Sequence, residues 1–207
     1  MTQSVREWTV QGAYAMVRFT SFADADASPA ATDLEIERVE AEVGRRLPPD
    51  YRQYLQTING GEVDPRGIAY RWTPSDIAVL NRFLSPLDDI ITEPVCLIDY
   101  FYSAGHQGSN FGLSRALQNV IDWAGRPGLL PIASTSIGDY IVMDLNDGPA
   151  HGSVHYMTIH GVAELDGTGI ENPLGFIAPS FSAFTKLFFD LDAITKAQVA
   201  ALMGQRR

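Results

Sequence analysis

Apolar residues recur at helical spacing in the segment 47–61, LPPDYRQYLQTINGG. Four positions fall at i, i+3, i+4 and i+7 and so share one helix face: Tyr51, Tyr54, Leu55 and Ile58. Pro49 suits a first helical turn, because its missing N–H would have no partner there and its φ is already helical. Asn59, Gly60 and Gly61 tolerate positive φ and can close the C-terminus. The segment therefore predicts a short helix with a defined start and end.

A second helix is predicted just before this one. Thr32 and Glu35 have the three-residue spacing of a capping box, and Gly44 can terminate the helix. Its apolar stripe consists of Ile36, Val39 and Val43. The sequence thus predicts two short helices in a row.

Strand-forming runs dominate the middle of the chain. They predict a strand or hairpin at 8–20 and strands at 67–72, 95–102, 129–133, 140–145 and 153–160. Short links join the last three runs, and strands joined in this way pair antiparallel, as a meander. Residues 73–94 contain several prolines and polar residues that interrupt regular secondary structure, which predicts an extended loop with one helical turn.

Helical patterns return in the second half of the chain. Ser114 precedes a helix that Gly125 and Pro127 stop. Ser180 opens another, whose apolar face would contain Phe181, Phe184, Leu187, Phe188 and Leu191. Thr195 and Gln198 can cap a last helix. Helices at both ends of a central, mostly antiparallel sheet predict an α+β fold.

The length of 207 residues and the 45% hydrophobic content predict one domain over residues 1–207. No apolar run approaches the ~18 residues that span a bilayer. The N-terminus lacks the continuous apolar stretch of a signal peptide, so we expect a cytoplasmic protein without membrane contact. The single cysteine, Cys96, fits a reducing compartment and cannot form an internal disulfide.

The net charge of −10 disfavours nucleic-acid binding, which needs clustered Lys and Arg. Residues 129–179 contain six acidic residues and no Lys or Arg, and residues 62–112 are also rich in acid. A cationic partner is one interpretation of this distribution. A solvated surface that keeps the protein soluble is the other.

Three histidines cluster as His151, His155 and His160, but a strand at 153–160 would project His155 and His160 from opposite faces. We therefore predict neither a metal site nor a cofactor. A hydrolytic site would use His106 or His155, and a nucleophile would come from Cys96 or the loop 103–110.

The nucleophile candidates carry little support in the sequence. Cys96 lies inside an apolar strand, which favours a packed thiol. The loop lacks the G-x-S-x-G elbow of a serine hydrolase and fits a turn instead. We predict no catalytic residues, and a small hydrolase stays the alternative from another class.

Several blocks together resemble the SUKH superfamily, also known as the fungal glucan-synthesis-regulator family. The blocks are IERVEAEVGRRLPPDYRQYLQTINGG, LLPIASTSIGDYIVMDL with its Gly138-Asp139 pair between two strands, GSVHYM and SFSAFTKLF. The resemblance covers about residues 32–191. An N-terminal extension at 1–31, the 73–94 loop and an extra C-terminal helix at 192–207 depart from the family pattern.

The resemblance implies an α+β protein-binding domain without catalytic residues. Fungal members are linked to regulation of cell-wall glucan synthesis, and many bacterial members look like immunity proteins that neutralise a toxin, often a nuclease or deaminase. We therefore expect a basic toxin domain as the partner, with a regulatory scaffold as the alternative.

Five acidic residues are the predicted contacts with this partner: Asp139, Asp144 and Asp147 in the meander, and Glu62 and Asp64 after the Asn-Gly-Gly. Asp139 and Asp147 fall in predicted turns, where we expect them to be exposed. Turn-capping or solvated carboxylates are the alternative interpretation.

Overall fold

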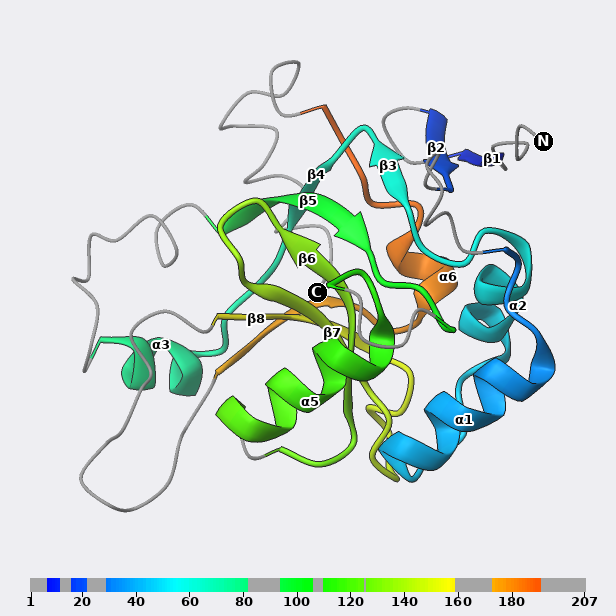
Figure 1. The fold of residues 1–207 in the computed structure, drawn as a ribbon. Helices are drawn as coiled ribbons and strands as arrows, with labels where there is room; N and C mark the ends of the chain where they lie inside the picture. Colours follow the sequence, from blue (N-terminus) through cyan, green and yellow to red (C-terminus); the bar gives the residue numbers. More distant parts are fainter. Residues whose placement is uncertain are drawn as a thin grey trace.

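The computed structural model describes residues 7–11, 16–21, 29–81, 94–105, 110–124, 126–158 and 173–190. Antiparallel sheets and helices make up an α+β fold, as predicted (Figure 1). The strands are β1 (Glu7–Gln11), β2 (Met16–Thr20), β3 (Glu62–Asp64), β4 (Gly67–Ala69), β5 (Val95–Phe101), β6 (Leu129–Thr135), β7 (Tyr140–Asp144), β8 (Val154–Met157) and β9 (Leu174–Ala178). The helices are α1 (Asp33–Val43), α2 (Pro49–Thr57), α3 (Pro74–Leu80), α5 (Leu113–Ala124) and α6 (Phe181–Phe184).

The strands form two sheets. β1, β2 and β3 make one in that order, and β4 to β9 make a six-stranded antiparallel sheet in chain order, which confirms the meander. This larger sheet curls until its ends meet. Arg71, just after β4, exchanges backbone hydrogen bonds of 2.8 and 2.7 Å with Phe176 on β9. The curled sheet therefore has an interior that side chains can fill.

Both predicted N-terminal helices are present, with the predicted ends. Thr32 and Glu35 form the capping box of α1, and Gly44 ends α1 in the left-handed region, at φ 69°. α2 begins at Pro49. Local chemistry sets these boundaries, because every group involved lies within a few residues of the helix end.

The Asn-Gly-Gly after α2 turns the chain into β3 through three positive φ angles. The Asn59 side-chain oxygen accepts from Ala104 N–H at 2.8 Å, and its amide donates to Ala104 O and Pro29 O at 3.0 and 2.6 Å. A Cβ on Gly60 would lie 2.8 Å from the Ser103 Cβ. The motif is therefore buried and structural.

The apolar face of α2 packs into an aromatic core. Tyr51 and Tyr54 contact Phe181 at ring-centroid distances of 4.9 and 5.0 Å, and Phe181 leads α6. α6 is a single turn capped by Ser180, shorter than predicted, because the chain leaves the helix after Phe184. Leu191 and the predicted last helix lie outside the described residues.

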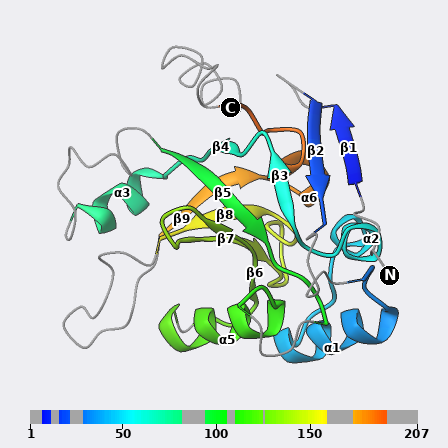
Figure 2. The ribbon, with the colours of Figure 1, turned by 45° about the horizontal axis from the view of Figure 1, so that its top comes forward.

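α5 packs on the outer face of the large sheet at β6, and α1 lies next to α5 (Figure 2). α3 occupies the start of the segment predicted as an extended loop, and residues 82–93 of that segment lie outside the described part. Among the described residues, the helices are too short or too polar to cross a membrane.

Candidate partner-binding surface

The five predicted contact residues do not form one cluster. Glu62 and Asp64 are exposed on β3 in the small sheet. Asp144 ends β7, and Asp147 is exposed in the turn between β7 and β8. In Figure 1 the strand β3 lies at the top of the molecule and that turn at the bottom. A single partner segment would therefore meet one pair or the other.

Asp139 is not exposed, so the prediction for this residue was wrong. Its side chain is fully buried, and its carboxylate accepts hydrogen bonds from the hydroxyls of Tyr156 and Thr158. The Tyr156 ring stacks on Tyr70 at 4.0 Å. Hydroxyl donors on β8 and just after it replace water around the carboxylate, because antiparallel pairing brings this part of the chain alongside the turn. Asp139 supports the fold and is not available for docking.

The outward face of the small sheet carries acidic residues from two strands. Strand register places Glu7 opposite Thr20, and Thr20 opposite Glu62. In the next row Arg18 forms an ion pair with Asp64 at 3.5 Å, with both side chains more than half exposed. Within the described residues, Glu7 and Glu62 make no ion pair. We call Glu7, Glu62 and Asp64 the acidic face.

Glu7 was missed in the sequence analysis. The signal that could have found it is alternation: Glu7, Thr9 and Gln11 are polar, whereas Trp8 and Val10 between them are apolar. This pattern marks one solvated side of a strand. Its position in the same row as Glu62, with Thr20 between them, depends on the pairing of β2 with β3, segments more than 40 residues apart, which no local pattern indicates.

The second acidic location consists of Asp144 and Asp147, at the turn between β7 and β8. Asp144 is half-buried, and its Oδ1 accepts from the backbone N–H and the side-chain amide of Asn146, both at 2.9 Å. Asp144 therefore organises the turn, as the turn-capping interpretation expected. Asp147 points into solvent.

His155 is a half-buried imidazole with a defined hydrogen bond. Its Nε2 lies 2.8 Å from the Ser153 hydroxyl, which itself donates to the carbonyl of Ala150. Nε2 therefore donates and Nδ1 carries the lone pair, and this Nδ1 is buried without a partner. Burial lowers the pKa of His155 below its ordinary value, although the carboxylates of Asp144 and Asp76 act in the opposite direction.

His155 should make the fold sensitive to mild acid. Its folded pKa lies below the unfolded value of about 6.5, so its contribution is complete above that pH and is lost as the pH falls. In urea unfolding at pH 7.5 and 5.5, the wild type should lose more stability on acidification than His155→Gln. His151→Gln is the control, because His151 is exposed and its ring Nδ1 makes a long contact of 3.3 Å with Leu145 O. If acidification lowers the free energy of unfolding equally in the wild type and in His155→Gln, the lowered pKa assigned to His155 is contradicted.

The other candidate chemical groups are also engaged in packing. Cys96 is 8% exposed, and burial, followed by the charge of Asp139, raises the pKa of its thiol and keeps it protonated. Ser103 is fully buried and donates to Phe111 O. No cluster suited to a metal occurs among the described residues, and His106 and His160 lie outside them.

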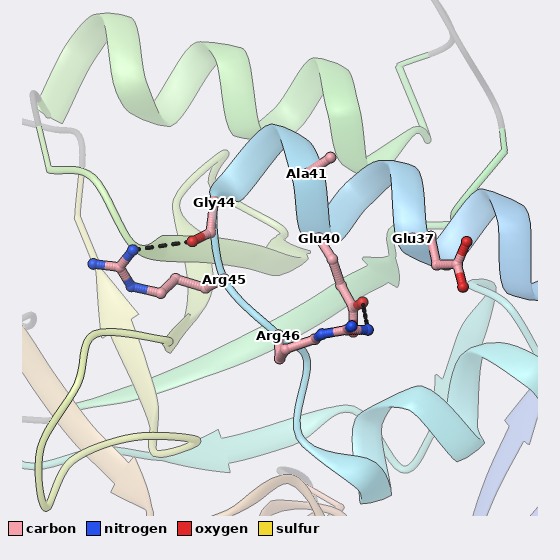
Figure 3. Close-up of a pocket in the computed structure, with 6 residues that line it drawn as sticks. All are labelled: Glu37, Glu40, Ala41, Gly44, Arg45 and Arg46. Carbon is pink, nitrogen blue, oxygen red and sulfur yellow. Dashed lines mark hydrogen bonds and ion pairs between the residues drawn. The ribbon is translucent and has the colours of Figure 1, made fainter.

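A surface hollow of about 400 Å³ lies at the C-terminal end of α1 (Figure 3). It is lined by Glu37, Glu40, Ala41, Gly44, Arg45 and Arg46. Arg46 pairs with Glu40 at 3.0 Å, and Arg45 donates to Gly44 O at 3.0 Å. These charged groups serve the helix end, and the hollow contains no nucleophile beside a base.

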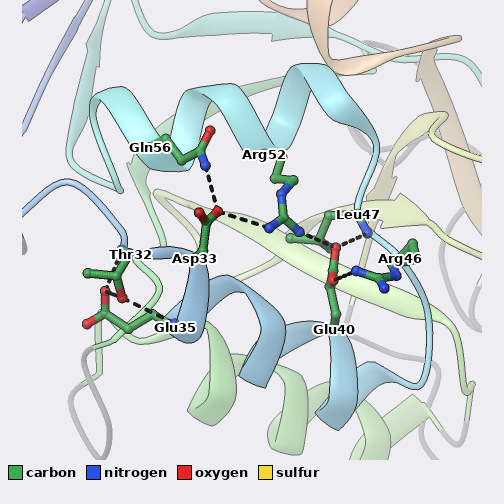
Figure 4. Close-up of polar contacts among 8 residues, drawn as sticks. All are labelled: Thr32, Asp33, Glu35, Glu40, Arg46, Leu47, Arg52 and Gln56. Carbon is green, nitrogen blue, oxygen red and sulfur yellow. Dashed lines mark hydrogen bonds and ion pairs between the residues drawn. The ribbon is translucent and has the colours of Figure 1, made fainter.

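Behind this hollow, Glu40 joins α1 to α2 (Figure 4). Its Oε1 accepts from Arg52 at 2.8 Å and from Leu47 N–H at 3.0 Å. Arg52 also donates to Asp33 at 3.1 Å. Burial raises the pKa of Glu40, but the Leu47 N–H and the two guanidinium groups outweigh it, so the net pKa is lowered. Glu40 is therefore an ionised, buried carboxylate with a structural role.

A curled antiparallel sheet with short capped helices packed against it defines an α+β fold. The model of the SMI1/KNR4 family (SUKH-1) matches residues 30–186, and the chain belongs to this family. The match agrees with the predicted extent of about 32–191. A search of curated proteins gave no match.

Proposed function

We propose that this protein is a non-catalytic immunity protein that neutralises a basic toxin domain by direct binding. The acidic face carries the proposal: Glu7 and Glu62 lie in the same cross-strand row of one sheet face, on either side of Thr20, and both are exposed and make no ion pair among the described residues. Family membership supports a binding role, and the net charge of −10 supports a cationic partner.

Inhibition of this kind needs no chemistry. A toxin that acts on nucleic acid carries a cationic substrate groove, so exposed carboxylates can occupy the positions of phosphates. Long-range attraction also raises the association rate, and salt weakens that effect because it screens exposed charges. A stable inhibitor therefore gains speed and selectivity from its surface charge.

Charge reversal on the acidic face tests the proposal. The Glu7→Lys/Glu62→Lys double variant should associate on the order of tenfold more slowly at low salt, with a weaker dependence on ionic strength. The partner for this assay is the basic protein that a pull-down with this chain captures from its native host, and the measurement is stopped-flow association at several salt concentrations. Folding should be retained, because exposed carboxylates contribute little to stability.

Two further variants locate the contact. Glu37→Lys/Glu42→Lys makes the same charge change at exposed positions of α1 and is the matched control. Asp147→Lys tests the turn between β7 and β8. If the control slows association as much as the acidic-face variant, only net charge matters and this face is not the contact. Normal binding by the acidic-face variant would refute the proposal.

A further inference from the structure

A small polar cavity lies next to β1, between the hairpin and the helices α2 and α6. Its lining residues are Trp8, Asp50, Gln53, Tyr54, Thr57 and Ser182. The cavity measures about 60 Å³. Because about 10–15 Å³ on this measure holds one water, the space fits a group of about four heavy atoms, such as a guanidinium or the end of a lysine side chain.

The lining chemistry suits a cation. The half-buried Asp50 carboxylate accepts one backbone N–H at each oxygen, from Tyr51 at 2.9 Å and from Ser182 at 2.8 Å. A carboxylate has about four acceptor positions, so each oxygen can take a further donor. Trp8 and Tyr54 supply aromatic rings 6.0 Å apart, and ring faces attract cations. Carboxylate and aromatic rings together favour Arg or Lys.

The strand beside this cavity is an open edge in the part of the chain that the structure describes. β1 pairs with β2 on one side and is the end of the order β1-β2-β3 (Figure 2). Its register with β2 is regular over five residue pairs. Edge strands are commonly protected by charged side chains, proline or a bulge, and the one charged residue of β1 (EWTVQ) is Glu7, whose carboxylate would attract a basic segment.

We infer that the edge of β1 and the adjacent cavity receive an extended basic segment of a protein partner, with one Arg or Lys head group in the cavity. The inference rests on the proposed function for the class of partner, a basic protein. Extended segments bind sheet edges through main-chain hydrogen bonds, and neighbouring pockets supply side-chain specificity. Asp50 and Glu7 provide the complementary charge.

Model compounds test the cavity without the partner. N-acetyl-arginine-methylamide is titrated into the full chain and followed by ¹⁵N-detected shifts of the Trp8 indole and the Ser182 amide. The citrulline analogue has the same shape without the charge. It should bind at least about fivefold more weakly, because the carboxylate and rings attract the cation. Equal binding of the two compounds, or no shift at these two residues, would overturn the inference.

Two variants assign the effect to the cavity. Asp50→Asn keeps an oxygen acceptor for one backbone N–H and should abolish the preference for arginine over citrulline. Trp8→Leu keeps an apolar contact with Phe19 and should weaken arginine binding. Asp147→Asn makes the same charge change as Asp50→Asn at the distant turn and should bind as the wild type does. If both Asp50→Asn and Trp8→Leu still bind arginine more tightly than citrulline, the cation binds outside this cavity.

Strand addition has its own test. The peptide acetyl-Thr-Val-Arg-Val-Thr-amide should bind at least about fivefold more tightly than the single arginine derivative, because it adds main-chain hydrogen bonds. Only alternate amides face a neighbouring strand, so N-methylation of one alternate set should remove this gain and methylation of the other should not. Identical effects of the two sets would rule out strand addition.

The outcomes also separate the inference from the proposed function. If arginine binds the cavity but the acidic-face variant associates normally with the toxin, the proposed immunity mechanism fails and the cation site stands. If the acidic face governs association but arginine does not shift Trp8, the cavity inference alone fails.

Discussion

Gly61→Ala should unfold the protein or destabilise it by more than about 4 kcal/mol. A Cβ at this position would lie 2.1 Å from the carbonyl oxygen of Thr20 and 2.8 Å from the Ser21 Cα, both backbone atoms that cannot rotate away. The φ of +119° adds strain that an L-residue rarely tolerates. The measurement is soluble yield followed by urea unfolding.

Gly44→Ala is the matched control for this prediction. Gly44 also has positive φ, at 69°, but nothing lies within 4 Å of a Cβ built there. Its substitution should cost only the left-handed backbone strain, about 1–2 kcal/mol. If the two alanine variants have similar stability, the close approach of β2 to Gly61 is not the limiting contact.

Arg52→Ala should have the second largest effect, a loss of about 3 kcal/mol. The change leaves the Glu40 carboxylate, whose side chain is 6% exposed, with the Leu47 N–H and the exposed Arg46 as its donors among the described residues. It also removes the Arg52 hydrogen bond to Asp33, which still accepts from Gln56 at 2.9 Å, and so weakens the link between α1 and α2. Urea unfolding at pH 7 measures the loss, and Arg38→Ala on the exposed side of α1 should change stability little.

The interaction of Glu40 with Arg52 should also appear in the dependence of stability on pH. The folded pKa of Glu40 lies below the unfolded value, so its contribution is present above about pH 4.5 and is lost as the pH falls further. Arg52→Ala should therefore lose less stability than the wild type on acidification. The Glu40→Gln/Arg52→Ala double variant should cost less than the sum of the single variants. Additive costs would show that the two residues act independently.

Local signals predict the ends of α1 and the start of α2, whereas the surroundings of buried groups depend on long-range contacts. The capping box of Thr32 with Glu35 and the start at Pro49 need only neighbouring residues, so both were predictable. The burial of Asp139 depends on hydroxyls 17 and 19 residues away, on β8 and just after it. A carboxylate in a Gly-Asp turn has the same sequence signature whether water or a tyrosine surrounds it.

The candidate site shows the same division. Glu62 and Asp64 were predicted from composition and are exposed, whereas Glu7 became part of the acidic face only through pairing of β1, β2 and β3. The cavity beside β1 joins three segments, with Asp50 and Ser182 separated by 132 positions. No period or motif connects such positions, so a cavity of this kind is found only in the folded chain.

The backbone pairing of Arg71 with Phe176, which closes the large sheet, also affects folding during synthesis. The sheet closes through contacts between distant parts of the chain, among them Gly67 with Phe189. High contact order of this kind slows folding, and a nascent chain that lacks its last strand presents unpaired edges. During synthesis the first half must therefore wait for the C-terminal segment, and C-terminal truncation before β9 should yield an aggregating product rather than a smaller domain.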